Sequence, residues 1–462
     1  MAEEVKRANP LASEGITKLL IRFAVPCILG MVVTSAYNIV DQIFIGRSVG
    51  IYGNAATNVA FPLAIVCTSL SLLFGIGGAA NFNLCLGRRQ EDRARLFMGS
   101  AVFLIVAGGV ILAAAVLLFL EPLLRLCGAT DQVLPYAATY VSVTALGIPF
   151  LLLTVAGGHL IRGDGSPAYA MVCSVVGAVI NTILDPIFLF GLKTGIVGAA
   201  WASVAGQFVS GVMVIFYLTR CKSVTLTFRD LRPRPRFCFG VVSLGLAPFC
   251  NQLAMMVVQI VLNNSLAFYG AASAYGGDIP LACAGIVSKV NMLFFSIVIG
   301  MSQGLQPIIG FNYGARRYDR VREAFWKMAA AATAVSVVSF LVFQIFPRPI
   351  TALFGDGGEG YFEFAEGFFR IFLFAIFLDG FQPIASNFFT AIGKPLRGVA
   401  LSLTRQILFL LPLLLILPRF FGIRGILFSS PIADVLAAAV SLTMVLLEFA
   451  SWKKQPPEGA VS

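Results

Sequence analysis

The chain has little charge and lacks the common motifs of soluble enzymes. Only 12% of its 462 residues are charged and 58% are hydrophobic, with a mean hydropathy of +0.89. Soluble domains have about 25% charged residues. The sequence has one histidine, and its nine cysteines show no CxxC spacing, so it offers no zinc site. A Walker A motif is also missing, because Gly393 and Lys394 are followed by Pro395, which argues against ATP hydrolysis.

Long hydrophobic runs recur along the whole chain. They are about 20 to 30 residues long, which suits a helix that crosses a bilayer, and they are continuously apolar, which argues against a β-barrel. Residues 1–15 are polar and lack signal-peptide features, so the first run is expected to be retained. We predict an all-α membrane protein with twelve transmembrane helices, at residues 16–46, 57–86, 96–120, 133–161, 168–190, 195–219, 239–270, 281–312, 323–346, 366–392, 397–417 and 424–449.

Lysine and arginine are distributed unevenly between alternate loops. With the N-terminus placed in the cytoplasm, the inside segments contain 22 of these residues and the outside loops contain six. The positive-inside rule therefore predicts that both termini are cytoplasmic. The net charge of +11 is then explained by membrane topology, and we expect no nucleic-acid partner.

The two halves of the chain resemble each other. The segment GRRQEDR (87–93) recurs as GARRYDR (314–320), and GIVG (195–198) recurs as GIRG (422–425), both 227 residues later. This repeat predicts two pseudo-symmetric six-helix bundles inserted in the same orientation. The expected organisation is an N-terminal lobe (1–219), a basic cytoplasmic linker (220–238), a C-terminal lobe (239–450) and a cytoplasmic tail (451–462). Pro26 and Pro248 interrupt the first helix of each lobe and are candidate hinges, because proline bends a helix.

Two acidic residues lie inside predicted helices of the N-terminal lobe. Asp41 and Asp185 fall near the outer ends of the first and fifth helices, at similar depth, and Tyr37 and Asn181 precede them by four residues on the same helix faces. Ionisable groups inside a membrane are costly and usually functional. The C-terminal lobe has no equivalent acidic pair, which favours function over architecture. Such a pocket suits a proton, or Na⁺ held by Asp41, Asn181 and Asp185.

The C-terminal lobe has charges of its own and a set of methionine and amide side chains. Lys289, Asp379, Arg405 and Asp434 either neutralise one another in the bundle interior or bind a substrate or ion; both interpretations stay open. Methionine with glutamine at helical spacing suits an adaptable cavity, although ordinary helix packing explains the same pattern. The candidate cavity residues are Met255, Gln259, Asn263, Met292, Gln303 and Asp379.

Several stretches resemble the MATE (multidrug and toxic compound extrusion) family, in particular its MepA-like branch. They are YNIVDQIFIG (37–46), NTILDPIF (181–188), GAAWAS (198–203) and GLQPIIGFNYGA (304–315), and the likeness covers nearly the whole chain. The resemblance implies two six-helix lobes arranged as a V around a central cavity, with alternating access. It also implies a cation site in the first lobe, formed by Tyr37, Asp41, Asn181 and Asp185 with a hydroxyl from Ser203.

This chain departs from some relatives, which have an acid on the seventh helix where it has amides. Asp379 does match an acid on their tenth helix. The first lobe is therefore the expected cation site.

Together, these observations predict a secondary active multidrug efflux antiporter and not an enzyme. It is expected to export organic, cationic lipophilic compounds in exchange for H⁺ or Na⁺, as a cofactor-free monomer in a prokaryotic plasma (inner) membrane. One alternative is a flippase for lipid-linked precursors, which would need a strongly basic cavity for a pyrophosphate group. A second alternative is a membrane scaffold or sensor, which would not need paired buried acids.

Overall fold

The protein is a bundle of long helices. The computed structural model describes residues 10–273, 275–276, 278–353 and 358–452, and no strand occurs in these ranges. Eleven helices within them are long and apolar enough to cross a membrane. A twelfth span consists of two helices, Glu359–Phe372 and Ile376–Ala391, that meet at an angle of 48°. The predicted all-α fold with twelve transmembrane segments is confirmed.

The helices form two bundles in the order of the sequence repeat. The first bundle contains α2 (Ile16–Val49), α3 (Ile51–Gly87), α4 (Glu91–Leu118), α6 (Leu134–Gly163), α7 (Pro167–Pro186) with the π-helical turn η1 (Ile187–Gly191), and α8 (Ile196–Leu218). The second contains α9 (Pro235–Ala271), α10 (Asp278–Gly314), α11 (Tyr318–Ile345), α13 (Glu359–Gly367) with η2 (Phe368–Phe372), α14 (Ile376–Asp379), α15 (Phe381–Ala391), α16 (Pro395–Leu403) with η3 (Thr404–Leu410), α17 (Leu411–Phe421) and α18 (Ile423–Trp452). The short helix α1 (Pro10–Ser13) precedes α2, α5 (Leu120–Leu126) lies between α4 and α6, and α12 (Pro347–Ala352) lies between α11 and α13.

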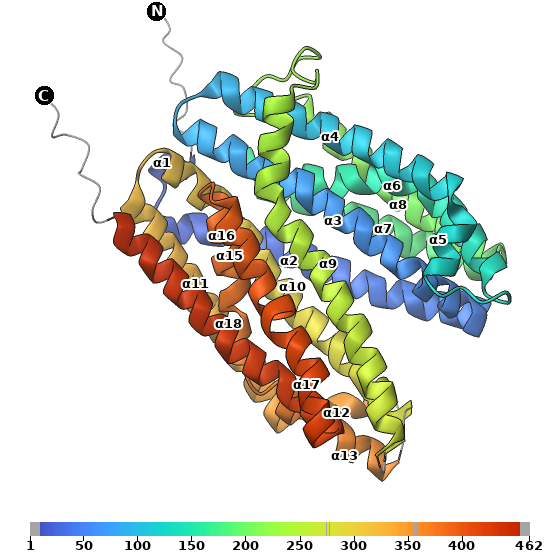
Figure 1. Ribbon diagram of the computed structural model, residues 1–462. Coiled ribbons are helices and arrows are strands. Elements are labelled where there is room, and N and C mark those ends of the chain that lie inside the picture. Colours follow the sequence, from blue (N-terminus) through green and yellow to red (C-terminus); the bar gives the residue numbers. More distant parts are fainter. Residues whose placement is uncertain (1–9, 274, 277, 354–357, 453–462) are drawn as a thin grey trace, which may run out of the picture.

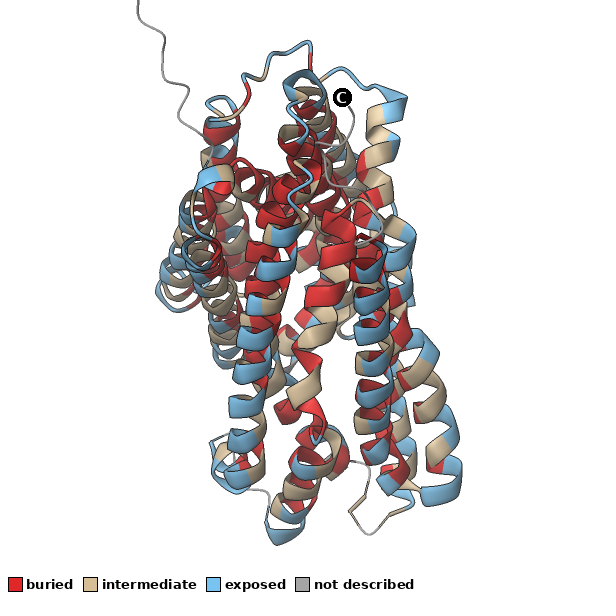
Figure 2. Ribbon diagram, turned by 90° about the vertical axis from the view of Figure 1, so that its left-hand side faces the viewer, coloured by how far each residue is buried: buried red, intermediate tan, exposed pale blue. Residues whose placement is uncertain are grey.

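The two bundles converge at one end of the molecule and diverge toward the other (Figure 1). Both described chain ends lie at the converging end, where α3 packs against α9 and α10 of the other bundle, and α2 packs against α10. Buried residues are concentrated in the same half (Figure 2). The space between the bundles is therefore closed at the end that carries the termini.

Glycines allow helix backbones to approach closely at this closed end. A Cβ atom on Gly245 of α9 would lie 1.8 Å from the backbone oxygen of Leu73 on α3. A Cβ atom on Gly300 of α10 would lie 2.6 Å from Cα of Ile28 on α2. Backbone atoms cannot move aside as a flexible side chain can, so these contacts require glycine.

The first helix of each bundle crosses from one bundle to the other. Residues near the start of α2, such as Leu19 and Phe23, belong to the core of the second bundle, whereas Ile45 packs inside the first. In α9 the relation is reversed, because Val241 lies in the core of the first bundle and Leu262 in that of the second. Pro26 and Pro248 lie between these halves, and both helices continue through them. Their role as hinges stays a prediction.

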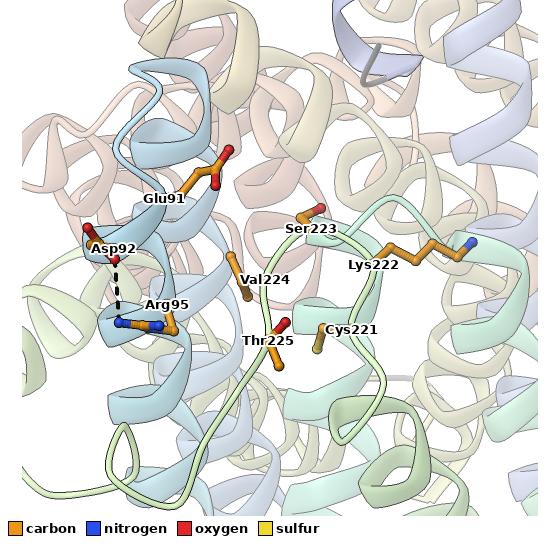
Figure 3. A pocket seen from close by; sticks show the side chains of 8 residues that line it. All are labelled: Glu91, Asp92, Arg95, Cys221, Lys222, Ser223, Val224 and Thr225. Carbon is orange, nitrogen blue, oxygen red and sulfur yellow. Dashed lines mark hydrogen bonds and ion pairs between the residues drawn. The ribbon is translucent and has the colours of Figure 1, made fainter. Parts of the chain in front are cut away.

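The connection between the bundles runs from Thr219 to Arg234, since α9 begins at Pro235, inside the predicted linker. Asp164 at the end of α6 anchors it by accepting hydrogen bonds from the backbone nitrogens of Lys222 at 2.7 Å and Ser223 at 2.9 Å. A surface cavity of about 260 Å³ lies between the linker and the start of α4 (Figure 3). Most of the predicted tail, residues 453–462, lies outside the described residues.

Asp230 fixes the second part of the linker. It is 4% exposed and accepts hydrogen bonds from the backbone nitrogen of Thr227 at 2.9 Å and its hydroxyl at 2.7 Å. It also forms an ion pair with Arg95 of α4 at 3.4 Å. Burial alone would raise the pKa of Asp230, but the Thr227 hydrogen bonds and the nearby arginines outweigh it and lower the pKa below its usual value.

We expect Asp230→Asn to lower the free energy of unfolding by about 1–3 kcal/mol, because a hydrogen-bonded charged group is lost. Since the folded pKa is lowered, this contribution is complete above the unfolded pKa of about 3.9 and is lost as the pH falls through the folded pKa. Thermal unfolding of purified protein would measure both effects. Asp92→Asn is the matched control, because Asp92 pairs with the same Arg95 but is 92% exposed. An equal loss in both variants would contradict the assignment.

Candidate cation and substrate sites

Helices α2 and α7 bring the carboxyl groups of Asp41 and Asp185 close enough to interact directly. Asp185 is 0% exposed and Asp41 is 9% exposed. Neither group forms an ion pair with a lysine or arginine in the part of the chain that the structure describes. One oxygen of each carboxyl group also has no hydrogen-bond partner there. The pair predicted from sequence is thus brought together and buried.

Asn181 and Ser203 orient one member of this pair. When the Asn181 amide nitrogen faces Asp185, it donates to Oδ2 of that carboxyl group at 3.0 Å. The amide oxygen then accepts hydrogen bonds from the backbone nitrogen and the hydroxyl of Ser203, both at 3.1 Å. Asn181 lies four residues before Asp185 on α7, so both side chains share one helix face. Ser203, on α8, thus fixes the amide that holds Asp185.

Two tyrosines complete the surroundings of the acidic pair. Tyr37 of α2 lies close enough to interact with both carboxyl groups, as the resemblance implied. Tyr140 of α6 lies close enough to interact with both carboxyl groups as well, and it is also close to Ser203. Sequence reasoning missed Tyr140, because an aromatic residue near the start of a predicted membrane helix is common at the membrane interface. Its position follows only from the packing of α6 against α8.

The acidic pair has a clear energetic consequence. Burial of a carboxylate without a partner costs several kcal/mol, and two like charges in contact repel each other strongly in a low dielectric. The contact between Asp41 and Asp185 is therefore stable when a proton or a small cation is shared between them.

The predicted substrate residues are divided among several places. Met255 and Asp379 line one cavity of about 60 Å³ in the second bundle, together with Asn251, Phe295, Ile299, Gln382, Pro383, Arg405 and Gln406. Gln259 instead donates a hydrogen bond to Asn263 at 2.9 Å along α9. The structure therefore places two of the six predicted residues in this cavity, with amide and aromatic neighbours that the sequence did not indicate.

The remaining two predicted residues both lie on α10. Met292 is 41% exposed, whereas Gln303 is buried, and its side-chain oxygen has no hydrogen-bond partner among the described residues. Neither residue lines the cavity that contains Asp379.

Three of the four charges noted in the second half meet in its interior. The Arg405 guanidinium contacts Asp434 at 2.7 Å and Asp379 at 3.1 Å. Ser430 donates a further hydrogen bond to Asp434 at 3.3 Å. Lys289 is exposed on α10 and forms no ion pair with them. The interpretation in which all four charges neutralise one another is therefore wrong for Lys289.

Comparison with known proteins agrees with this architecture. The family model MatE matches residues 26–187 and 253–416, two segments that start 227 residues apart, as the repeat does. The multidrug export proteins MepA of Staphylococcus haemolyticus and Staphylococcus saprophyticus are similar, with 24% identity over 432 residues (93% of each chain) and 25% over 446 residues (94% of each).

Solved structures show the same fold. A multidrug resistance MATE family transporter in an outward-facing conformation has a TM-score of 0.90 and 24% identity to this chain, covering 97% of this chain and 99% of that one. A MOP superfamily transporter from Pyrococcus furiosus has the same TM-score at 23% identity, with the same coverage. From its two matches to the family model and its fold, the chain belongs to the MatE family and is a membrane transporter rather than an enzyme.

Proposed function

We propose that this transporter is a secondary active multidrug efflux antiporter, which exports organic cations with lipophilic bodies in exchange for an ion bound at Asp41 and Asp185. The observation that carries the proposal is the interaction between two buried carboxyl groups, neither of which is paired with a lysine or arginine among the described residues. A residue that serves only architecture gains nothing from such an arrangement, whereas an ion carrier needs it. The similarity to MepA multidrug export proteins supports the same substrate class.

The shape of the molecule supports alternating access. The bundles are closed at the end with the termini and separated at the other end (Figure 1). We place the closed end in the cytoplasm of a prokaryotic cell, in agreement with the distribution of lysine and arginine. Binding of the coupling ion from outside then stabilises one arrangement of α2 and α7. Transport requires that the ion and the substrate favour different arrangements.

The geometry favours a proton over Na⁺ as the coupling ion. Na⁺ needs several oxygen ligands, and the predicted sodium site used Asp41, Asn181 and Asp185. However, in the amide orientation that satisfies Asp185 as a hydrogen-bond acceptor, the nitrogen of Asn181 faces Asp185 and its oxygen accepts from Ser203. Sodium binding by Asn181 would therefore require its amide to rotate and to give up two hydrogen bonds. A shared proton needs no such change.

The second bundle argues against the flippase alternative. A pyrophosphate group needs a strongly basic cavity, but the cavity beside Asp379 contains one arginine that is already paired with two carboxylates. An organic cation suits this surrounding better than an anion. The cavity therefore supports cationic rather than anionic substrates.

The proposal is tested by transport in reconstituted vesicles under one gradient at a time. We expect a pH gradient alone to drive accumulation of a fluorescent organic cation such as ethidium, and a Na⁺ gradient alone to drive little. Protein-free vesicles with the same gradients are the control for passive movement. Transport under Na⁺ alone would assign the other ion, and failure under both gradients would overturn the antiport proposal.

A further inference from the structure

The linker between the bundles exposes a phenylalanine together with many basic side chains. Phe228 is 92% exposed, the highest value of any large hydrophobic side chain that the structure describes. The one acid of the linker, Asp230, is buried and paired with Arg95 of α4. The exposed basic residues of the linker and of the first turn of α9 are Arg220, Lys222, Arg229, Arg232, Arg234 and Arg236.

The linker is fixed in place, so Phe228 is held outward. Val224 and Leu226 pack against the core of the first bundle. The backbone nitrogen of Asp230 donates a hydrogen bond to the backbone oxygen of Thr227 at 2.9 Å, which closes a tight turn. The Asp230 carboxylate strengthens this turn by accepting from the backbone nitrogen and the hydroxyl of Thr227. Phe228 and Arg229 are the two central residues of the turn and therefore lie at its tip.

Three further arginines follow the turn and alternate with proline, in the segment RPRPR (232–236). Proline fixes its own φ and disfavours a helical conformation in the residue before it. Arg234 is accordingly extended, with φ −120° and ψ 109°. The next residue after the segment, Phe237, packs edge-on against Phe97 of α4 with the ring centroids 4.8 Å apart. The arginines are therefore held apart on an extended backbone whose end is anchored to the first bundle.

Both ends of the linker meet the surface that faces lipid. Phe216 near the end of α8 is 52% exposed, and Phe239 near the start of α9 is 75% exposed; both belong to helices that are long and apolar enough to span a membrane. The guanidinium of Arg220 lies 4.5 Å from the centroid of the Phe216 ring. A charged head stacked on an exposed aromatic ring at the end of a span is typical of the membrane interface. The linker also runs along the outer edge of the molecule, beside the start of α4 (Figure 1).

This combination of groups fits the head-group region of a membrane. Clusters of four to eight basic residues next to a membrane helix attract anionic lipids, and guanidinium groups form paired hydrogen bonds with phosphate. Insertion of the exposed Phe228 ring among acyl chains removes apolar surface from water, which is favourable. An acidic peptide or a nucleic acid would also bind the arginines, but it would not account for an exposed phenylalanine beside them at the level of the membrane interface.

We propose that the linker binds anionic phospholipids in the leaflet at the closed end of the molecule. Phe228 lies among the acyl chains, and the four arginines at positions 229, 232, 234 and 236 bind the phosphate groups. The linker leads directly into α9, so the bound lipids hold the first turn of α9 at the membrane surface. The inference is independent of which ion or compound the chain transports.

A tryptophan reporter at the tip of the turn tests the inference. Protein with Phe228→Trp is reconstituted into phosphatidylcholine nanodiscs that contain an equal share of a lipid with brominated acyl chains, either phosphatidylglycerol or phosphatidylcholine. Bromine quenches tryptophan fluorescence on contact, and the signal of the three native tryptophans is subtracted with the wild type. We expect quenching by brominated phosphatidylglycerol to exceed that by brominated phosphatidylcholine at least about threefold, because the arginines enrich the anionic lipid.

A charge variant and a second reporter provide the controls. The triple variant Arg232→Gln, Arg234→Gln, Arg236→Gln in the Phe228→Trp background should lose the preference for phosphatidylglycerol but keep quenching by phosphatidylcholine. High salt should weaken the preference as well. Phe420→Trp is the matched reporter, because Phe420 is 76% exposed and follows a single arginine, Arg419, at the diverging end of the molecule. It should show no such preference.

Thermal unfolding and size-exclusion chromatography check that every variant is folded. Absence of quenching at position 228 by either lipid would place the ring in water and overturn the inference. Equal quenching by both lipids, unchanged in the triple variant, would overturn the assignment of anionic lipids. Polyglutamate is added to the reporter in plain phosphatidylcholine nanodiscs in parallel. A shift of the reporter emission by polyglutamate, without a preference for phosphatidylglycerol, would assign the surface to an acidic macromolecule instead.

Discussion

Asp185→Asn and Asp41→Asn should each abolish transport driven by a pH gradient, with a loss of at least about tenfold relative to wild type. An asparagine amide does not bind and release a proton as a carboxyl group does. Either variant therefore removes the change in charge of the pair that we propose to move α2 against α7. Asn is nearly isosteric with Asp and can keep the contact between the helices. The variants should therefore remain folded and still bind substrate.

The measurement is the initial rate of ethidium accumulation in vesicles with equal amounts of each variant. Asp131→Asn is the matched control, because Asp131 belongs to the same bundle but its side chain is 88% exposed and pairs with Arg125 at the surface. It should transport at the wild-type rate. Undiminished transport by both Asp41→Asn and Asp185→Asn would refute the role of the pair.

Gly300→Val should prevent closure between the bundles and reduce transport at least about tenfold, because overpacking at a rigid contact costs about 1–3 kcal/mol or more. The new Cβ atom would lie 2.6 Å from Cα of Ile28 and 2.8 Å from its nitrogen, so α10 and α2 must separate. Cys27, which is 3% exposed next to this contact, should then react faster with a membrane-permeant maleimide. Peptide mass spectrometry distinguishes Cys27 from the other cysteines.

Gly285→Val serves as the control on the same helix. A Cβ atom on Gly285 meets nothing within 4 Å, so this variant carries the same change in helix propensity and hydrophobicity without the collision. Its transport rate and Cys27 labelling should match the wild type. Equal behaviour of the two variants would show that the contact at Gly300 is not needed for closure.

The sequence by itself determined the membrane fold. A bilayer offers no hydrogen-bond partners to the backbone, so a long apolar run has to form a helix, and twelve such runs gave the twelve spans. The 227-residue repeat indicated two bundles. The pairing of Asp41 with Asp185 could also be predicted from the sequence. Charged residues are rare in a membrane, and both lie at similar depth on helices that run in the same direction.

Only the tertiary structure decided what surrounds each acidic pair. Arg405 lies between Asp379 and Asp434, while Lys289 does not join them, because helix rotation and packing set which face of a span meets its neighbours. Tyr140 joins the first pair through the packing of α6 against α8. The break in the tenth span falls between Phe372 and Ile376, where no glycine or proline marks it. Such contacts join residues that are far apart in the sequence, so they cannot be predicted from the local sequence pattern.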